Sequence, residues 1–162
     1  IGTVFLPLMM LSLNPGFALF GWAKPVPVNP LNLSNRKRDD ILISMAGPAM
    51  NVILAIVILA VLRLAIEMPE GISKSAIVAE LPRIAFISMF LCLFNLIPVP
   101  PLDGSHVMRH VVGMSEETYR NIARFGFIIV LVVINIPGVI SFIADINEKF
   151  MVTTMTLLMF PT

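Results

Sequence analysis

Hydrophobic residues in this chain gather in long runs instead of alternating with polar ones. The clearest run follows Pro48, where residues 49–66 carry a single charge, Arg63, close enough to the end for its side chain to reach the lipid–water interface. As an α-helix this run covers roughly 27 Å, close to the thickness of the hydrocarbon core of a bilayer. The pattern therefore predicts a transmembrane helix over 41–66.

Further apolar stretches predict spans near 84–97 and 122–144, and a partial apolar segment over 1–22 that is interrupted by Pro7. We therefore expect an all-α fold, a polytopic transmembrane helical bundle with a proline-rich broken-helix segment. The predicted organisation is a single membrane-embedded domain over 1–162.

Composition and charge agree with a membrane protein. Hydrophobic residues make up 57% of the 162 residues and charged residues 13%, and the mean hydropathy is high. The 11 basic and 10 acidic side chains give a net charge of +1 and are scattered along the chain. This balance excludes a nucleic-acid partner and leaves the lipid bilayer as the expected surroundings.

The distribution of basic residues predicts an orientation. Lys and Arg are more frequent in the loop before 41–66 and in the loop after Asp103 than in the loop between them. Because cytoplasmic loops are richer in Lys and Arg, the first two loops should be cytoplasmic. We therefore expect a multi-pass integral membrane protein of a bacterial inner membrane, with Asp103 near the cytoplasmic side.

The segment 94–105 places a carboxylate, Asp103, at the end of an apolar run and behind three prolines. A charge at membrane depth is costly and points to function, and broken backbone in a membrane needs a polar or protein-lined site. Asp103 could be a metal ligand or a proton carrier in a hydrated cavity. Alternatively, its carboxylate could cap a helix running to Val112. The residues alone leave both interpretations open.

Two histidines follow Asp103 and are four residues apart, so His106 and His110 should share one helix face. That spacing could hold a metal ion, but the glutamate of an H-E-x-x-H motif is missing and Arg109 lies beside the pair. Interfacial histidines that are solvated or bonded locally are therefore the preferred interpretation.

Small and polar residues recur every four positions in the 41–66 helix, at Gly47, Asn51 and Ala55. This stripe predicts close helix packing, with Gly47 and Asn51 as either packing or cleft residues. Asn95, at the break of the next apolar segment, could likewise pack between helices or hold a substrate backbone.

Two motifs resemble signatures of the site-2 proteases, which are intramembrane zinc metalloproteases. Residues 44–51 resemble the A-G-P-x-x-N signature, and 95–104 resemble N-x-x-P-x-x-P-x-D-G. Residues 20–30 resemble a loop typical of the compact bacterial branch of that family. The resemblance covers nearly the whole chain.

This resemblance implies specific roles. Asp103 would be a Zn²⁺ ligand, and the motif residues that would shape the substrate cleft are Asn95, Pro98, Pro101 and Gly104. An extended wall beside the metal would let a substrate dock as an added strand. The family's other ligands and its general base come from an H-E-x-x-H motif, which this chain lacks.

We therefore expect a fragment of an intramembrane zinc metalloprotease, inactive alone, with the H-E-x-x-H helix encoded just before Ile1. The complete protein would hydrolyse peptide bonds of transmembrane protein substrates. The alternative is a catalytically inactive relative that binds partner helices as a membrane scaffold. A transporter using Asp103 would need a second ionisable residue inside another span, and the cores of 41–66 and 122–144 have none.

Overall fold

The computed structural model describes residues 35–67, 69 and 71–159, and the ordered elements among them are all helices. The predicted segment 1–22 and the motif at 20–30 lie outside the described residues. No strand occurs in the described part, which confirms the all-helical class. The helices are α2 (Arg36–Ile66), α3 (Ile72–Asn95), α4 (Gly104–Val111), α5 (Glu116–Ala123), α6 (Gly126–Ile134) and α7 (Val139–Met159).

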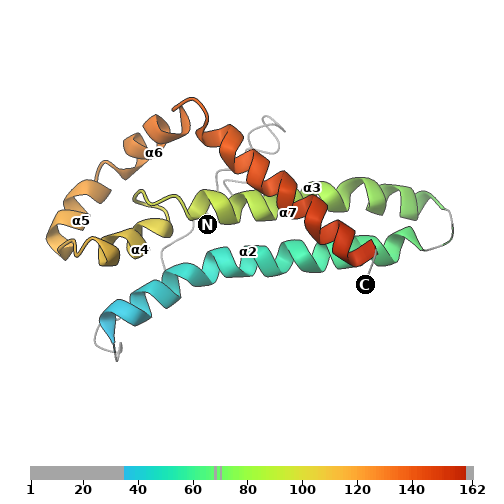
Figure 1. The fold of residues 1–162 in the computed structure, drawn as a ribbon, viewed down its shortest axis with the longest axis horizontal. Helices are drawn as coiled ribbons and strands as arrows, with labels where there is room; N and C mark the ends of the chain where they lie inside the picture. The colour runs from blue at the N-terminus through green and yellow to red at the C-terminus, as the bar shows by residue number, and fades with distance from the viewer. Residues whose placement is uncertain (1–34, 68, 70, 160–162) are drawn as a thin grey trace, which may run out of the picture. The chain divides into compact units, whose positions relative to one another are not determined.

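Helices α2 and α3 lie side by side as an antiparallel pair, and α7 crosses both of them (Figure 1). The core between them contains Ala55, Leu59, Ala85 and Cys92, all nearly inaccessible to solvent. Small residues at such contacts let helix backbones approach closely. Ser88 adds a polar contact, because its hydroxyl donates to the carbonyl of Asn51 at 2.9 Å.

Helix α2 begins at Arg36, earlier than the predicted span, because Asn35 caps it. The side chain of Asn35 accepts from the amide of Arg38 at 3.2 Å, and the Asn35 amide donates to the carboxylate of Asp39 at 3.0 Å. This reciprocal pair satisfies two of the amides that a helix start leaves open. Asp40 consequently lies inside the helix, with its carboxylate free for other partners.

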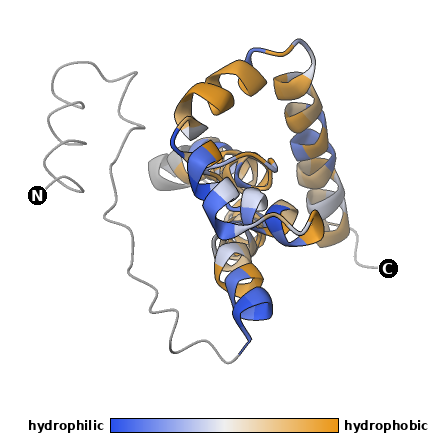
Figure 2. Cartoon of the chain, turned by 90° about the vertical axis from the view of Figure 1, so that its left-hand side faces the viewer, coloured by the Kyte–Doolittle hydropathy of each residue, from blue (hydrophilic) through white to orange (hydrophobic). Residues whose placement is uncertain are grey.

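Two of the described helices, α2 and residues Ile77–Asn95 of α3, are long and apolar enough to cross a membrane. Helices α6 and α7 form a third candidate if counted together, although they are bent by 75°. The predicted span at 122–144 thus covers the end of α5, all of α6 and the start of α7, and the break between α6 and α7 lies at 135–138, where Pro137 and Gly138 favour a turn. Figure 2 shows that α6 is hydrophobic along its length, whereas the start of α2 is hydrophilic.

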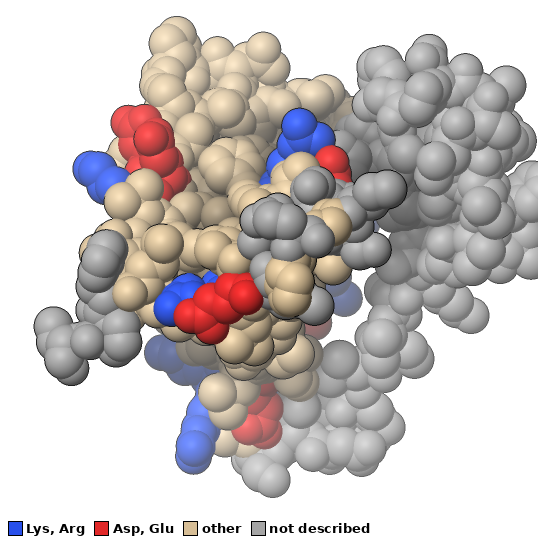
Figure 3. All heavy atoms as spheres, turned by 90° about the vertical axis from the view of Figure 1, so that its right-hand side faces the viewer, with Lys and Arg blue, Asp and Glu red and all other residues tan. Residues whose placement is uncertain are grey.

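Charged side chains are sparse on the face shown in Figure 3. Where they occur, acidic and basic groups lie next to each other among uncharged residues (Figure 3). Two ion pairs join residues three or four positions apart in the sequence, Arg63 with Glu67 at 2.6 Å and Arg83 with Glu80 at 3.0 Å. Exposed pairs of this kind contribute little to stability.

Candidate functional site

The chain between α3 and α4 folds into tight turns. The amide of Ile97 donates to the carbonyl of Phe94 at 3.1 Å, and that of Leu102 donates to Val99 at 2.9 Å. The prolines between them have no amide hydrogen, so they cannot continue a helix or complete a strand ladder. The expectation of an extended wall for strand addition is therefore wrong for this segment, since the turns consume its backbone donors.

Asp103 occupies the N-cap position of α4, but it does not cap the helix. Its backbone is already helical, with φ −59° and ψ −36°, and its side chain makes no hydrogen bond to the helix amides. The carboxylate lies against α2 instead, because a Cβ added to Gly47 would be 3.2 Å from its Oδ2. The capping alternative is thus excluded, and the carboxylate is available to a ligand.

The surroundings of Asp103 affect its ionisation in opposite directions. Partial burial raises the pKa of the Asp103 carboxyl, because burial disfavours the charged form. The neighbouring His106 acts in the opposite sense through its charge, and the net result is a raised pKa. A cation that binds this carboxylate would also compensate for the loss of solvation.

Two glycines allow the backbone to approach closely at this site. A Cβ on Gly104 would lie 2.5 Å from the carbonyl carbon of Leu96 and 2.8 Å from the carbonyl oxygen of Ile97. A Cβ on Gly126, at the start of α6, would lie 2.7 Å from the carbonyl oxygen of Pro100. Any larger residue would displace main chain at these positions, so both glycines fix the turns that present Asp103.

His106 and His110 are bonded to a distant helix. Nδ1 of His106 donates to Oδ1 of Asp40 at 3.2 Å, and Nε2 of His110 donates to Oδ2 of the same carboxylate at 2.7 Å. Both residues are partly buried. The expectation that they are solvated or bonded locally is therefore wrong. The sequence offered a signal in the four-residue spacing, but none that named Asp40 as the partner.

Helix α4 also contacts Tyr119 of α5. The hydroxyl of fully buried Ser105 donates its hydrogen to the carbonyl oxygen of Leu102 at 2.6 Å, because a carbonyl oxygen can only accept. The same Ser105 hydroxyl lies 2.8 Å from the hydroxyl of Tyr119. Tyr119 therefore donates to Ser105. The guanidinium of Arg109 lies over the Tyr119 ring, 5.3 Å from its centroid. Helix α4 consequently has side-chain contacts with both α2 and α5.

The remaining predicted cleft residues lie around the same turn. Asn95 is the last residue of α3, and Pro101 lies against Gly126. Pro98 lines an apolar cavity of about 500 Å³. The other walls of that cavity come from α3, the turn that follows it, the 135–138 break and α7: Leu93, Leu96, Ile97, Pro137, Gly138, Val139, Phe142, Ile143 and Ile146.

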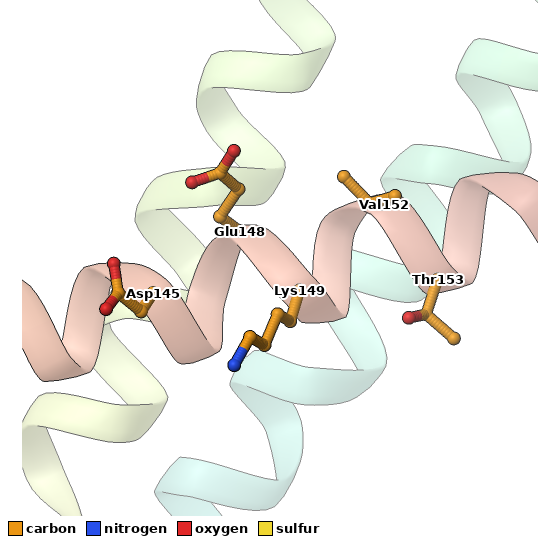
Figure 4. Close-up of a pocket in the computed structure, with 5 residues that line it drawn as sticks. All are labelled: Asp145, Glu148, Lys149, Val152 and Thr153. Atoms are coloured by element: carbon orange, nitrogen blue, oxygen red, sulfur yellow. The ribbon is translucent and has the colours of Figure 1, made fainter.

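A second hollow, of about 380 Å³, lies on α7 and is more polar. Figure 4 shows that its five lining residues all come from this one helix: Asp145, Glu148, Lys149, Val152 and Thr153. It contains none of the residues that the sequence predicts for the site. Among the described residues, no group of three or more His, Cys, Asp or Glu side chains could hold a metal ion.

These features define a class, an integral membrane protein of α-helices in which a proline-interrupted turn presents a partly buried carboxylate to a neighbouring helix. The model of peptidase family M50 matches residues 64–134, which include the turn and Asp103. This match shows that the chain is similar to the family of the site-2 zinc metalloproteases. The resemblance inferred from the motifs is thereby confirmed.

Curated relatives agree with this family. "Putative zinc metalloprotease YwhC" of Bacillus subtilis is 35% identical over 122 residues, covering 73% of this chain and 56% of the relative. "Putative zinc metalloprotease Rip2" of Mycolicibacterium smegmatis is 30% identical over 104 residues, covering 62% and 38%. The Rip2 protein of Mycobacterium tuberculosis is 28% identical over 152 residues, covering 88% and 54%. The chain thus spans about half the length of most of these relatives, and no solved structure matches it.

Proposed function

We propose that this chain forms part of an intramembrane zinc metalloprotease that hydrolyses peptide bonds of transmembrane protein substrates, and that Asp103 is one of its zinc ligands. The observation that carries the proposal is the Asp103 carboxylate, which is partly buried, makes no capping bond and faces Gly47. A carboxylate left without a structural role beside a broken helix is a candidate functional group.

The residues present fit zinc in part. A carboxylate oxygen is an ordinary zinc ligand, and the absence of a Cβ at Gly47 leaves space beside Oδ2 of Asp103. A catalytic zinc needs three protein ligands, and the described residues supply no such group. The remaining ligands would come from an H-E-x-x-H helix, as the family resemblance implies. Zinc in such a site supplies Lewis acidity and a nucleophile at neutral pH.

The protein's own residues would supply the surroundings for this chemistry. The turn between Asn95 and Gly104 would form one side of the substrate cleft, and Pro98 borders an apolar cavity that suits a hydrophobic segment. Peptide hydrolysis within a bilayer needs a polar, protein-lined site, which a broken helix can provide. The proposed location is the bacterial inner membrane, with Asp103 near the cytoplasmic face.

The first experiment determines the complete reading frame and tests Asp103 in the protein it encodes. We expect an H-E-x-x-H motif upstream of Ile1 and about one zinc per molecule, measured by atomic emission after purification in detergent. Asp103→Asn should lose most of this zinc and all cleavage of a transmembrane reporter substrate, while its amount in the membrane stays unchanged. The matched control is Asp39→Asn, which removes the same charge from a helix-capping carboxylate.

Two outcomes would contradict the proposal. Full zinc content in Asp103→Asn would exclude Asp103 as a ligand. An upstream region without H-E-x-x-H, together with a wild-type protein that binds no zinc, would favour the inactive scaffold.

A further inference from the structure

Asp40 and the two histidines form a connection between α2 and α4 that the proposed chemistry does not require directly. The single carboxylate of Asp40 accepts from His106 at 3.2 Å and from His110 at 2.7 Å. All three side chains are partly buried, with 28% exposure for Asp40 and 16% for His110. Bonds to a partly desolvated charged group are among the stronger ones in proteins.

The spacing of the contacts shows that the two helices face each other along their length. Asp40 and Gly47 are seven residues apart on α2, which places them on one face about two turns apart. Asp103 and His110 are seven apart as well, at the start of α4 and within it. Because Asp40 contacts His110 while Gly47 faces Asp103, α4 runs antiparallel to this part of α2.

A short stretch of backbone links the connection to Asp103. The amide of His106 donates to the carbonyl of Asp103 at 3.1 Å, so the two residues belong to the same helical turn. A displacement of α4 that carries His106 away from Asp40 would therefore move Asp103 with it. Helix α4 has only eight residues, too few to hold this position by its own stability.

We propose that Asp40 is a positioning residue, which holds the Asp103 carboxylate in place for metal binding by anchoring His106 and His110. This inference rests on the proposed function of Asp103 as a zinc ligand. Asp40 binds no zinc itself, since both of its oxygens accept from histidine. Residues that orient a metal ligand without touching the metal commonly change metal affinity by about 10- to 100-fold when they are removed.

The first test measures hydrogen–deuterium exchange in detergent, with no metal added, on the chain described here. Asp40→Ala should speed the exchange of the α4 amides by at least tenfold and leave the α3 amides near Ala85 within twofold of wild type. Asp39→Ala is the matched control, because among the described residues the neighbouring carboxylate accepts from the amide of the N-cap residue Asn35 and has no bond to α4. It should leave α4 unchanged. Asp40→Glu, which keeps a carboxylate, should restore part of the protection.

The second test measures zinc affinity of the complete protein by competition with a chelator. Asp40→Ala should weaken zinc binding by about 10- to 100-fold, and Asp39→Ala should not change it. If Asp40→Ala does not accumulate, His110→Leu removes the 2.7 Å bond from the other helix and should give the same two effects.

The outcomes separate this inference from the proposed function. Unchanged α4 exchange in Asp40→Ala would refute the anchoring of α4. Faster exchange with unchanged zinc affinity would make Asp40 a structural residue only and overturn the positioning role. Full zinc retention in Asp103→Asn would overturn the zinc-ligand assignment itself, whatever the effect of Asp40→Ala on exchange.

Discussion

Replacing Gly104 by alanine should destabilise the protein, although the same change stabilises most helices. Gly104 is the first residue of α4, where alanine would ordinarily gain about 0.5–1 kcal/mol over glycine. Here the added Cβ would lie 2.5 Å from the carbonyl carbon of Leu96 and 2.8 Å from the carbonyl oxygen of Ile97. Both atoms belong to the main chain of a hydrogen-bonded turn, so they cannot move aside as a flexible side chain could.

The magnitude follows from these two opposing effects. Extra atoms forced into a packed region cost about 1–3 kcal/mol, and rigid backbone neighbours place this case at the upper end. Subtracting the alanine gain leaves a net destabilisation of about 2 kcal/mol, which corresponds to about a thirtyfold larger unfolded fraction. The displacement should also move Asp103, the adjacent residue, so the zinc affinity proposed for the complete protein should fall together with stability.

The assay is an SDS titration of the protein in mixed micelles, with the folded fraction read by pulse proteolysis. Gly71→Ala is the control, because nothing lies within 4 Å of an added Cβ there and its φ of 179° is open to any residue. We expect Gly71→Ala to stay within about 0.5 kcal/mol of wild type. Wild-type or greater stability of Gly104→Ala would refute the close approach of α4 to the Leu96 turn.

Two further changes probe the packing around the site by the same titration. Tyr119→Phe removes the hydroxyl that donates to Ser105 at 2.8 Å and should cost about 1 kcal/mol; an unchanged midpoint would show that this bond contributes nothing. Asn147 is fully buried in α7, and its side-chain amide donates to the carbonyl of Phe86. Asn147→Asp places a negative charge opposite that carbonyl and should lower the free energy of unfolding by about 3 kcal/mol. Asn147→Leu is its control and should cost far less, so equal losses in the two variants would contradict the charge argument.

Much of the architecture could be predicted from hydrophobic patterning. The apolar runs identified the regions of α2 and α3, and the break between α6 and α7 contains Pro137 and Gly138, residues that favour a turn. Helix ends were less accurate, because the start of α2 depends on the Asn35–Asp39 capping pair and not on hydropathy. The extended wall before Asp103 was not found, because proline excludes a regular helix but does not distinguish an extended chain from tight turns.

The partner of the two histidines could not be predicted for a different reason. Their spacing indicated a shared face, but Asp40 lies 66 and 70 residues away along the chain. No periodicity within one helix shows which residue of another helix it will contact. The capping geometry at Asn35 uses the Asp39 carboxylate and leaves that of Asp40 to the histidines, a division that the sequence does not show.

The two motifs that carried the family resemblance meet at a single contact. Gly47 comes from A-G-P-x-x-N on α2, and Asp103 with Gly104 comes from the D-G end of the proline-rich motif. Glycine at both positions has a steric purpose, since Gly47 leaves space beside the Asp103 carboxylate and Gly104 leaves space for the preceding turn. The spacing of seven residues on each helix then brings Asp40 opposite His110. One helix–helix contact therefore sets the position of the proposed ligand, and a change anywhere along it should be detectable as a change in metal affinity.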